Sequence, residues 1–344
     1  MDTFRSVLEV CKMLDVRDVL RSAGLVCVLW TKVEQTTELW DELLRVLCSP
    51  DPPYYPSTVS AKQACRLKLQ SRGRLAVFRE NEVVLFDCKA EVWRRFPLQS
   101  LAPAVHCTSV YLPTGHLLCC GGLEIVLKDT RGLELSAAAT AFLLNIDGGS
   151  VRRTGNLLTG RHSQGMVCYV GTVYVFGGVN THTLRKAEEY HIATKRWRSL
   201  PSMNNSRHLF NPCARLDHIY LCGGVDCDSM EIFSIRERRY TVIDIVLPVT
   251  RCWQCASVLV QDELVYMAGA FAVKMSLCEL KVSIVRKAEL KCAWQDSSPQ
   301  YWNDHIYYQH TSGIGRLALS TFQSVLIPCL PALPCSSDEH LQIC

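Results

Sequence analysis

Four stretches of the chain share one hydrophobic pattern, in which a run of apolar residues ends in small residues, chiefly glycine. They are Leu117–Gly122, Val173–Gly178, Ile219–Gly224 and Leu264–Gly269. Their last large apolar residues are Cys120, Phe176, Cys222 and Met267, so the successive steps are 56, 46 and 45 residues. A recurring step of this size indicates one supersecondary unit used several times. Such units stack to bury their apolar faces and usually present a binding surface.

Alternating apolar and polar positions extend over residues 65–330, with turns at Gly, Asn and Asp, and they predict strands throughout this region. We count six units, with seven also compatible: residues 65–102, 103–160, 161–206, 207–249, 250–298 and 299–330. Because a ring of sheets must close to protect its edges, we expect the less regular first and last units to share one sheet. Residues 123–141 fall between two strands of the second unit and should project from one face.

On both sides of this region the hydrophobic pattern no longer alternates as in strands. Residues 1–47 have helical periodicity, as in Phe4, Val7 and Leu8, and predict three short amphipathic helices. Residues 48–64 contain four prolines, which exclude helix and predict a stiff linker. Residues 331–344 are polar and contain proline, so we expect a loose tail.

Composition restricts the class of protein. The chain has 344 residues, of which 48% are hydrophobic and 20% charged, and its net charge is +4. No run approaches the roughly 18 apolar residues that span a bilayer, and the first residues lack the layout of a secretory signal. The basic residues form no stripe, so neither nucleic acid nor membrane is an expected partner. We expect a cytoplasmic or nuclear protein.

The 19 cysteines are odd in number and irregularly spaced. In a reducing compartment, free cysteines such as Cys119, Cys120 and Cys222 behave as small buried hydrophobic residues. The best metal-binding candidate is the pair Cys252 and Cys255, but a single Cys-x-x-Cys without a second pair is a weak zinc signal. We therefore predict neither a metal nor a cofactor.

The third unit has the most detailed pattern. One strand is followed by a second that ends in Gly177 and Gly178, a third ends in Tyr190, and a fourth opens near Trp197. This succession closely resembles the kelch repeat. The resemblance implies a mainly β protein, with a kelch-type β-propeller of about six blades preceded by a small three-helix domain.

Two sets of residues in the repeat have expected structural roles. The double glycines should turn the chain where a Cβ atom would clash or forbid the required φ. These are Gly121, Gly122, Gly177, Gly178, Gly223 and Gly224. Aromatic residues recur seven positions apart, as a hairpin of fixed register requires. The pairs are Phe86 with Trp93, Tyr190 with Trp197, and Phe233 with Tyr240.

The N-terminal helical pattern resembles an F-box in the spacing from Leu14 to Asp18 and from Trp30 to the Leu39–Trp40 pair. It departs from the family where Asp2 and Thr3 replace the usual Leu-Pro, and residues 18–27 are one residue too long. The resemblance implies a surface for the linker subunit of a ligase, which connects to a cullin. The residues implied in that core and interface are Leu8, Val10, Leu14, Val19, Leu20, Val26, Cys27, Trp30, Leu39 and Trp40. A generic helical cap on the propeller is the alternative.

Arginine begins three consecutive units, at Arg161, Arg207 and Arg251. Equivalent positions of successive blades meet around one mouth of the channel. Three guanidinium groups there would suit an acidic peptide, because each can bind a carboxylate through two hydrogen bonds. Alternatively, each arginine braces neighbouring backbone segments. Both roles remain open from the sequence.

These patterns favour the substrate-recognition subunit of an SCF-type cullin ubiquitin ligase, in which the F-box binds the linker subunit and the propeller binds an unknown target protein. The alternatives are a kelch interaction scaffold without a role in ubiquitination and, third, a propeller enzyme. We predict no catalytic residues, since the histidines show no metal-site spacing and the acidic residues fall mostly in turns and at strand ends.

Overall fold

The computed structural model divides the chain into two units, Met1–Arg72 and Gly73–Cys344. All described residues belong to the second unit. They are residues 74–78, 82–87, 92–97, 107–112, 114–128, 132–145, 150–169, 171–215, 217–225, 227–245, 247, 255–260, 263–268, 271–278, 281–289, 299–302, 305–310, 313–328 and 340–343. The predicted helical domain at residues 1–47 and the linker at residues 48–64 lie outside this set. No described segment is a helix with the length and hydrophobicity needed to cross a membrane.

The described strands form six four-stranded antiparallel sheets, which we call the first to sixth blades. The first blade contains β1 (Arg74–Phe78), β2 (Glu82–Asp87), β3 (Val92–Pro97) and β26 (His340–Ile343). The second contains β4 (Thr108–Tyr111), β5 (His116–Cys120), β8 (Ala141–Asn145) and β9 (Val151–Arg153). The third contains β10 (Gly165–Tyr169), β11 (Thr172–Phe176), β12 (Ala187–His191) and β13 (Arg196–Leu200).

The other three blades follow the same order along the chain. The fourth contains β14 (Cys213–Arg215), β15 (His218–Cys222), β16 (Met230–Ser234) and β17 (Arg239–Ile243). The fifth contains β18 (Cys255–Val260), β19 (Glu263–Ala268), β20 (Phe271–Cys278) and β21 (Lys281–Glu289). The sixth contains β22 (Gln300–Trp302), β23 (His305–His310), β24 (Gly313–Ala318) and β25 (Ser324–Pro328).

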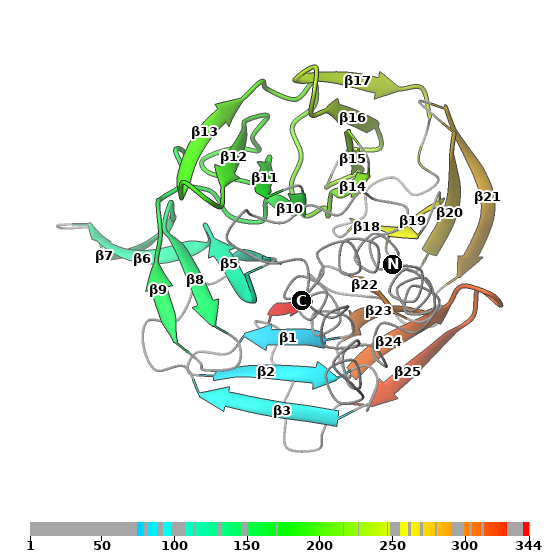
Figure 1. The fold of residues 1–344 in the computed structure, drawn as a ribbon, viewed down its shortest axis with the longest axis horizontal. Helices are drawn as coiled ribbons and strands as arrows, with labels where there is room; N and C mark the ends of the chain where they lie inside the picture. The colour runs from blue at the N-terminus through cyan, green and yellow to red at the C-terminus, as the bar shows by residue number, and fades with distance from the viewer. Residues whose placement is uncertain are drawn as a thin grey trace, which may run out of the picture. The chain divides into compact units, whose positions relative to one another are not determined.

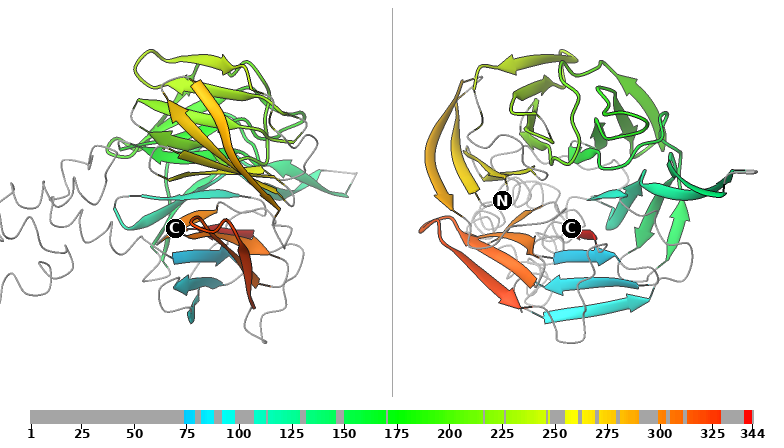
Figure 2. Two further views of the ribbon diagram at one scale, coloured as in Figure 1. Left: turned by 90° about the vertical axis from the view of Figure 1, so that its right-hand side faces the viewer. Right: turned by 180° about the vertical axis from the view of Figure 1, so that it is seen from behind.

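Within Gly73–Cys344 the blades are arranged radially around a central axis (Figure 1). Their innermost strands contact one another in the order β26, β4, β10, β14, β18 and β22. Each blade runs from an inner strand near the axis to an outer strand at the rim, as the view from behind also shows (Figure 2). The predicted mainly β propeller is therefore confirmed.

The closure of the ring differs from the prediction. The last unit does not share a sheet with the first, because β22 to β25 form a sheet of their own. Instead β26 pairs with β1, from Leu75 opposite Ile343 to Phe78 opposite His340. Residues 340–343 therefore belong to a blade and not to a loose tail. This pairing covers the backbone hydrogen-bonding groups of β1 on its inner edge, which would otherwise be open.

The second strand of each regular blade explains the apolar runs in the sequence. On β11, Val173 and Val175 lie in a buried cluster shared with the second blade. Tyr174 and Phe176 lie in a different cluster, shared with the fourth blade. Because successive side chains point to opposite faces, a strand buried on both faces must be apolar at every position.

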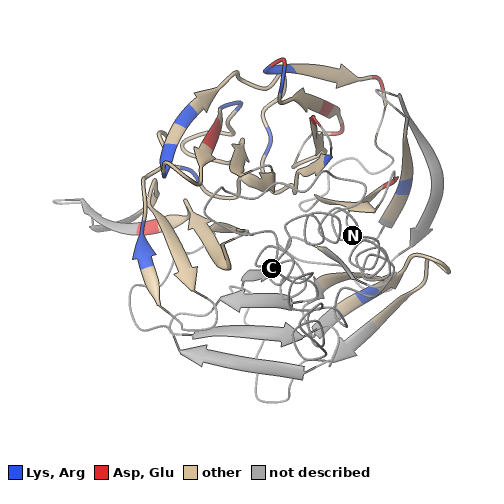
Figure 3. Cartoon of the chain, in the orientation of Figure 1, with Lys and Arg blue, Asp and Glu red and all other residues tan. Residues whose placement is uncertain are grey.

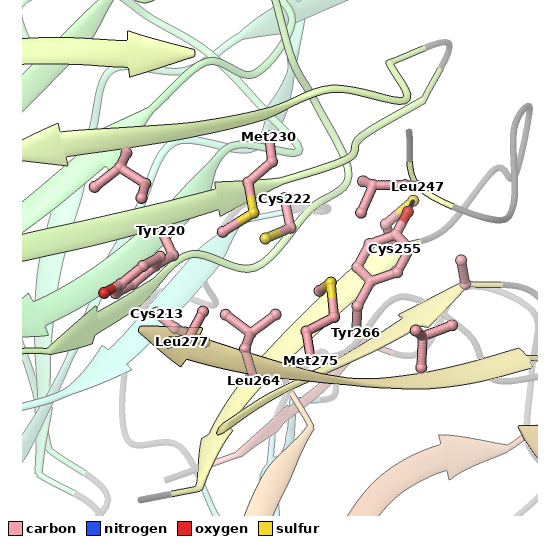
Figure 4. Close-up of a cluster of buried hydrophobic side chains, with 13 residues drawn as sticks. Cys213, Tyr220, Cys222, Met230, Leu247, Cys255, Leu264, Tyr266, Met275 and Leu277 are labelled. Carbon is pink, nitrogen blue, oxygen red and sulfur yellow. Dashed lines mark hydrogen bonds between the residues drawn. The ribbon is translucent and has the colours of Figure 1, made fainter. Parts of the chain in front are cut away.

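The core between the fourth and fifth blades shows the same packing (Figure 4). Its labelled residues are Cys213, Tyr220, Cys222, Met230, Leu247, Cys255, Leu264, Tyr266, Met275 and Leu277. The cysteines here serve as apolar packing residues, as the sequence predicts. Burial raises the pKa of the Cys222 thiol to about 12, so this group stays protonated and unreactive.

The insertion in the second blade is a β-hairpin of β6 (Leu123–Lys128) and β7 (Gly132–Ala137). It lies between β5 and β8, the second and third strands of that blade, as predicted. The hairpin extends beyond the ring in Figure 1 and in both views of Figure 2. It is thus an addition to a blade that already has four strands. Leu135, a large apolar residue on β7, is 65% exposed.

Candidate protein-interaction site

The double glycines lie where one blade meets the next. All six have positive φ, between 61° and 123°. A Cβ atom on Gly177 would overlap the carbonyl oxygen of Arg207, and one on Gly121 would overlap that of Arg161. The neighbouring amides of Gly178 and Gly122 donate hydrogen bonds to the same two carbonyls. These glycines therefore allow close contact between the backbones of adjacent blades.

Arg161 is completely buried, although its side chain is charged. Its Nη1 donates to the carbonyl oxygens of Gly177 and Lys186, at 2.8 Å and 2.9 Å. Its Nη2 forms an ion pair with the Glu188 carboxylate. That carboxylate also accepts hydrogen bonds from the amides of Leu158 and Thr159, in the loop that arrives from the second blade.

Arg207 repeats this arrangement in the fourth blade. It is completely buried, and its Nη1 donates to the carbonyl oxygens of Gly223 and Ser229. Its Nη2 lies 2.9 Å from the Glu231 carboxylate, which accepts from the amides of Asn204 and Asn205. Burial alone would raise the pKa of Glu231, but the hydrogen bond and attraction of Arg207, together with the two amides, hold it below its usual value.

The two arginines therefore do not form a site for an acidic peptide, and that reading is corrected. Each guanidinium group is enclosed and engaged with its own blade, so it has no surface on which a partner could lie. Arg161 and Arg207 instead brace the loop that joins each blade to the previous one. Arg251 lies outside the described residues. Glu188 and Glu231 were not identified from the sequence. Each is the second residue of the third strand of its blade, and this shared position is the signal that could have indicated them.

The aromatic pairs have the predicted register. Tyr190 lies opposite Trp197 and Phe233 opposite Tyr240 across antiparallel strands, with ring centroids 5.0 Å and 4.8 Å apart. Phe86 and Trp93 are paired in the same way along the backbone of β2 and β3. The register prediction is therefore confirmed.

Trp197 and Tyr190 also connect the third blade to the second. The Trp197 Nε1 donates to the carbonyl oxygen of Gly155 at 2.5 Å, and the Tyr190 hydroxyl lies 2.6 Å from the Thr154 Oγ1. Thr154 and Gly155 directly follow β9, the outer strand of the second blade. These bonds hold the end of β9 beside the start of β13.

Five exposed basic side chains lie at the rim of these two blades but do not share one face: Arg196 and Arg198 lie with Leu200 on the face of β13 toward the fourth blade, and Arg153 lies with Phe142 on the face of β9 away from the third blade. The five are Arg152, Arg153, Lys195, Arg196 and Arg198. They lie on β9, on β13 and in the turn before β13, along the rim of the ring (Figure 3). None of the five forms an ion pair with a carboxylate of the described residues.

An ion pair crosses the junction of the third and fourth blades. Arg238 of the fourth blade lies 3.3 Å from Glu189 of the third blade, and Arg239 forms an ion pair with Glu237. Arg238 and Lys195 occupy equivalent turns, directly before the outer strand, and both have φ near +50°, at 52° and 55°. Lys195 thus differs from Arg238 in forming no ion pair with a carboxylate of the described residues.

The remaining site predictions concern residues of which the structure describes no side chain. The ten F-box residues, from Leu8 to Trp40, lie outside the described residues, and of Trp93 only the backbone is described. Among the described residues, no group of three or more His, Cys, Asp or Glu side chains is arranged to bind a metal.

Comparison with known families places a kelch motif at residues 160–204. This match covers the third blade together with the buried Arg161 and Glu188. A search among curated proteins found no match. The chain is thus a β-propeller that carries a kelch motif, which indicates a protein-interaction domain.

Proposed function

We propose that the protein is the substrate-recognition subunit of an SCF-type cullin ubiquitin ligase. The N-terminal segment would bind the linker subunit and thereby the cullin, and the propeller would hold the target protein. The observation that carries the proposal is the F-box-like spacing of residues 1–47 ahead of a propeller with a kelch motif. The propeller supplies a rigid surface for a partner, since its charged braces and double glycines fix each blade against the next.

Co-purification with the linker subunit tests this function. The wild-type chain should retain the linker subunit, whereas Leu20→Asp and Trp30→Ala should each weaken binding at least tenfold by disrupting the apolar face of the F-box. Arg236→Glu, an exposed change on the fourth blade, serves as control and should leave binding unchanged. The proposal fails if the wild-type chain does not bind the linker subunit, or if both N-terminal variants bind as the wild type does.

A kelch scaffold without a role in ubiquitination is the second candidate, and it is favoured by the fact that the family match falls wholly within the propeller. It predicts that a chain lacking residues 1–50 keeps its partners and its cellular role. In the ligase function, the same deletion would keep target binding but abolish target ubiquitination. Measuring both properties of the truncated chain distinguishes the two functions.

A further inference from the structure

We propose that the β6–β7 hairpin joins two copies of this chain, by pairing the free edge of β6 with the same strand of a second copy. The two β6 strands would run antiparallel, related by a two-fold axis at Val126. The surface involved belongs to the hairpin alone. The proposal therefore stands whether or not the N-terminal segment binds a ligase linker subunit.

The hairpin is not needed to complete the second blade. Strands β5 and β8 pair directly with each other, so the blade has its four strands without β6 and β7. At the base of the hairpin the Ala138 amide donates to the Gly122 carbonyl oxygen at 2.8 Å, and from there both strands extend beyond the ring (Figures 1 and 2). A hairpin of two strands is only marginally stable in water, and a further strand stabilises it. A second copy would supply that strand.

The outer edge of β6 is straight and open. Among the described strands β6 pairs only with β7, because the two form a sheet of their own. The pairing runs without a register shift from Leu123 opposite Ala137 to Lys128 opposite Gly132. The six residues of β6 include no proline. Bulges and prolines are two of the devices that prevent an edge strand from pairing with another chain, and β6 has neither.

The backbone groups of β6 alternate between the two edges. Because Gly122 accepts a hydrogen bond from the β7 side, the alternation of an antiparallel ladder directs the groups of Val126 toward β7 as well. The amide and carbonyl groups of Ile125 and Leu127 then point to the free edge. In a pair centred on Val126, Ile125 lies opposite Leu127 of the second copy, and the two residues exchange both backbone hydrogen bonds.

The same register makes the charges of β6 complementary to themselves. Glu124 and Lys128 are equally distant from Val126, so Glu124 of each copy lies opposite Lys128 of the other. These are the closely spaced positions of an antiparallel pair, with Cα atoms about 4.5 Å apart. Opposite charges across such a pair are stabilising, whereas like charges are destabilising. The Glu124 side chain is exposed and therefore accessible to a second copy.

The other ways of pairing two hairpins lack this complementarity. Glu134 is the only charged residue of β7, so no register of β7 with itself forms a pair of opposite charges. Two β6 strands side by side in parallel would bring Glu124 beside Glu124 and Lys128 beside Lys128. The antiparallel pair uses the free edge of β6 in both copies, so assembly closes at a dimer and does not continue into a filament.

Apolar positions on the other face of the hairpin add to the pairing. The residues at these alternate positions are Leu123, Ile125, Leu127, Leu133, Leu135 and Ala137. Leu135 is 65% exposed, so part of this face is in contact with solvent in the single chain. In the dimer the apolar faces of the two hairpins become one, and apolar neighbours across a strand pair stabilise it.

Sedimentation velocity of the full-length chain tests the proposal. Because one strand pair is a small interface, we expect a reversible dimer within a concentration range that extends to ~100 μM. E124K places lysine opposite lysine twice and should raise the dimer dissociation constant about tenfold. K128E places glutamate opposite glutamate and should do the same. The double variant E124K/K128E restores opposite charges and should dimerise to within about threefold of the wild type.

Asp244→Lys is the matched control, since it makes the same change in net charge as E124K at an exposed position of the fourth blade. Its dissociation constant should stay within about twofold of the wild-type value. If the charge variants do not fold, a chain with a short Gly-Ser linker in place of residues 123–137 replaces them, and it should be monomeric.

Three results would overturn the proposal. The wild type could remain a monomer over the whole concentration range. The oligomer could persist in the chain that lacks the hairpin. Finally, the double variant could dimerise no better than E124K and K128E, which would show that Glu124 and Lys128 do not lie opposite each other between copies.

Discussion

Two neighbouring junctions of the propeller are alike inside and different outside. Where the second blade meets the third, Glu188 holds the arriving loop and pairs with Arg161; where the third meets the fourth, Glu231 does the same with Arg207. At the rim, by contrast, Arg238 is paired with Glu189 of the preceding blade, whereas Lys195, in the equivalent turn of the third blade, forms no ion pair with a described carboxylate.

This difference follows from the unequal free-energy costs of changing a buried charge and an exposed one. A buried charge must be paired and hydrogen-bonded, because an isolated one is costly to remove from water. The brace therefore recurs in both blades with nearly the same contacts. An exposed ion pair contributes little to stability, so the rim can vary without harm to the fold. Exposed charges that differ between otherwise equal junctions are candidates for a role in recognition.

Breaking the inner brace should have the largest effect. Arg207→Met removes the positive partner of Glu231 and leaves a buried carboxylate that is only partly compensated by the amides of Asn204 and Asn205. We expect the free energy of unfolding to fall by about 3–5 kcal/mol. Urea unfolding followed by tryptophan fluorescence measures this change.

The matched control is Arg239→Met, which removes an arginine from an exposed ion pair of the same blade. We expect its effect to stay within about 0.5 kcal/mol. If Arg207→Met were no more destabilising than Arg239→Met, the buried pair would not be the brace described above. The buried arginine–glutamate pair would then not be what fixes one blade against the next.

Acid pH should weaken the same brace in a defined direction. The pKa of Glu231 is held below its usual value of 4.5 in the folded state by Arg207 and two amides, despite burial. The stability gained from this carboxylate is thus present above pH 4.5 and is lost as the pH falls through the lower folded value. Glu231→Gln, which cannot titrate, should lose less stability than the wild type over this range. Unfolding curves at a series of acidic pH values test this, and parallel pH profiles of the two proteins would contradict it.

Local sequence patterns determined most of the fold. The second strands are apolar at every position because both of their faces are buried, and this produced the visible repeat. The register followed from aromatic pairs such as Tyr190 with Trp197. The strand β26 was missed because His340–Ile343 are four residues of mixed polarity, and their pairing with β1 joins distant parts of the chain.

The candidate site was harder to predict from sequence. Arg161 and Arg207 were recognised from their spacing, but the choice between bracing and binding depends on Glu188 and Glu231, whose shared place in the third strand shows only once the strands are aligned. Whether a charge at the rim is paired depends on a residue of the adjacent blade. Arg238 meets Glu189, whereas the equivalent place for Lys195 is occupied by Leu143, so this difference became visible only in three dimensions.

The smallest expected effect on stability tests the rim directly. Glu189→Gln removes the carboxylate that pairs with Arg238 and makes the third–fourth junction resemble the second–third junction. Because Arg238 is 47% exposed along its side chain, the free energy of unfolding should fall by only about 0.2–1 kcal/mol. Urea unfolding curves of the variant and the wild type measure this change. A loss as large as that of Arg207→Met would show that the exposed pair, and not only the buried brace, fastens the two blades.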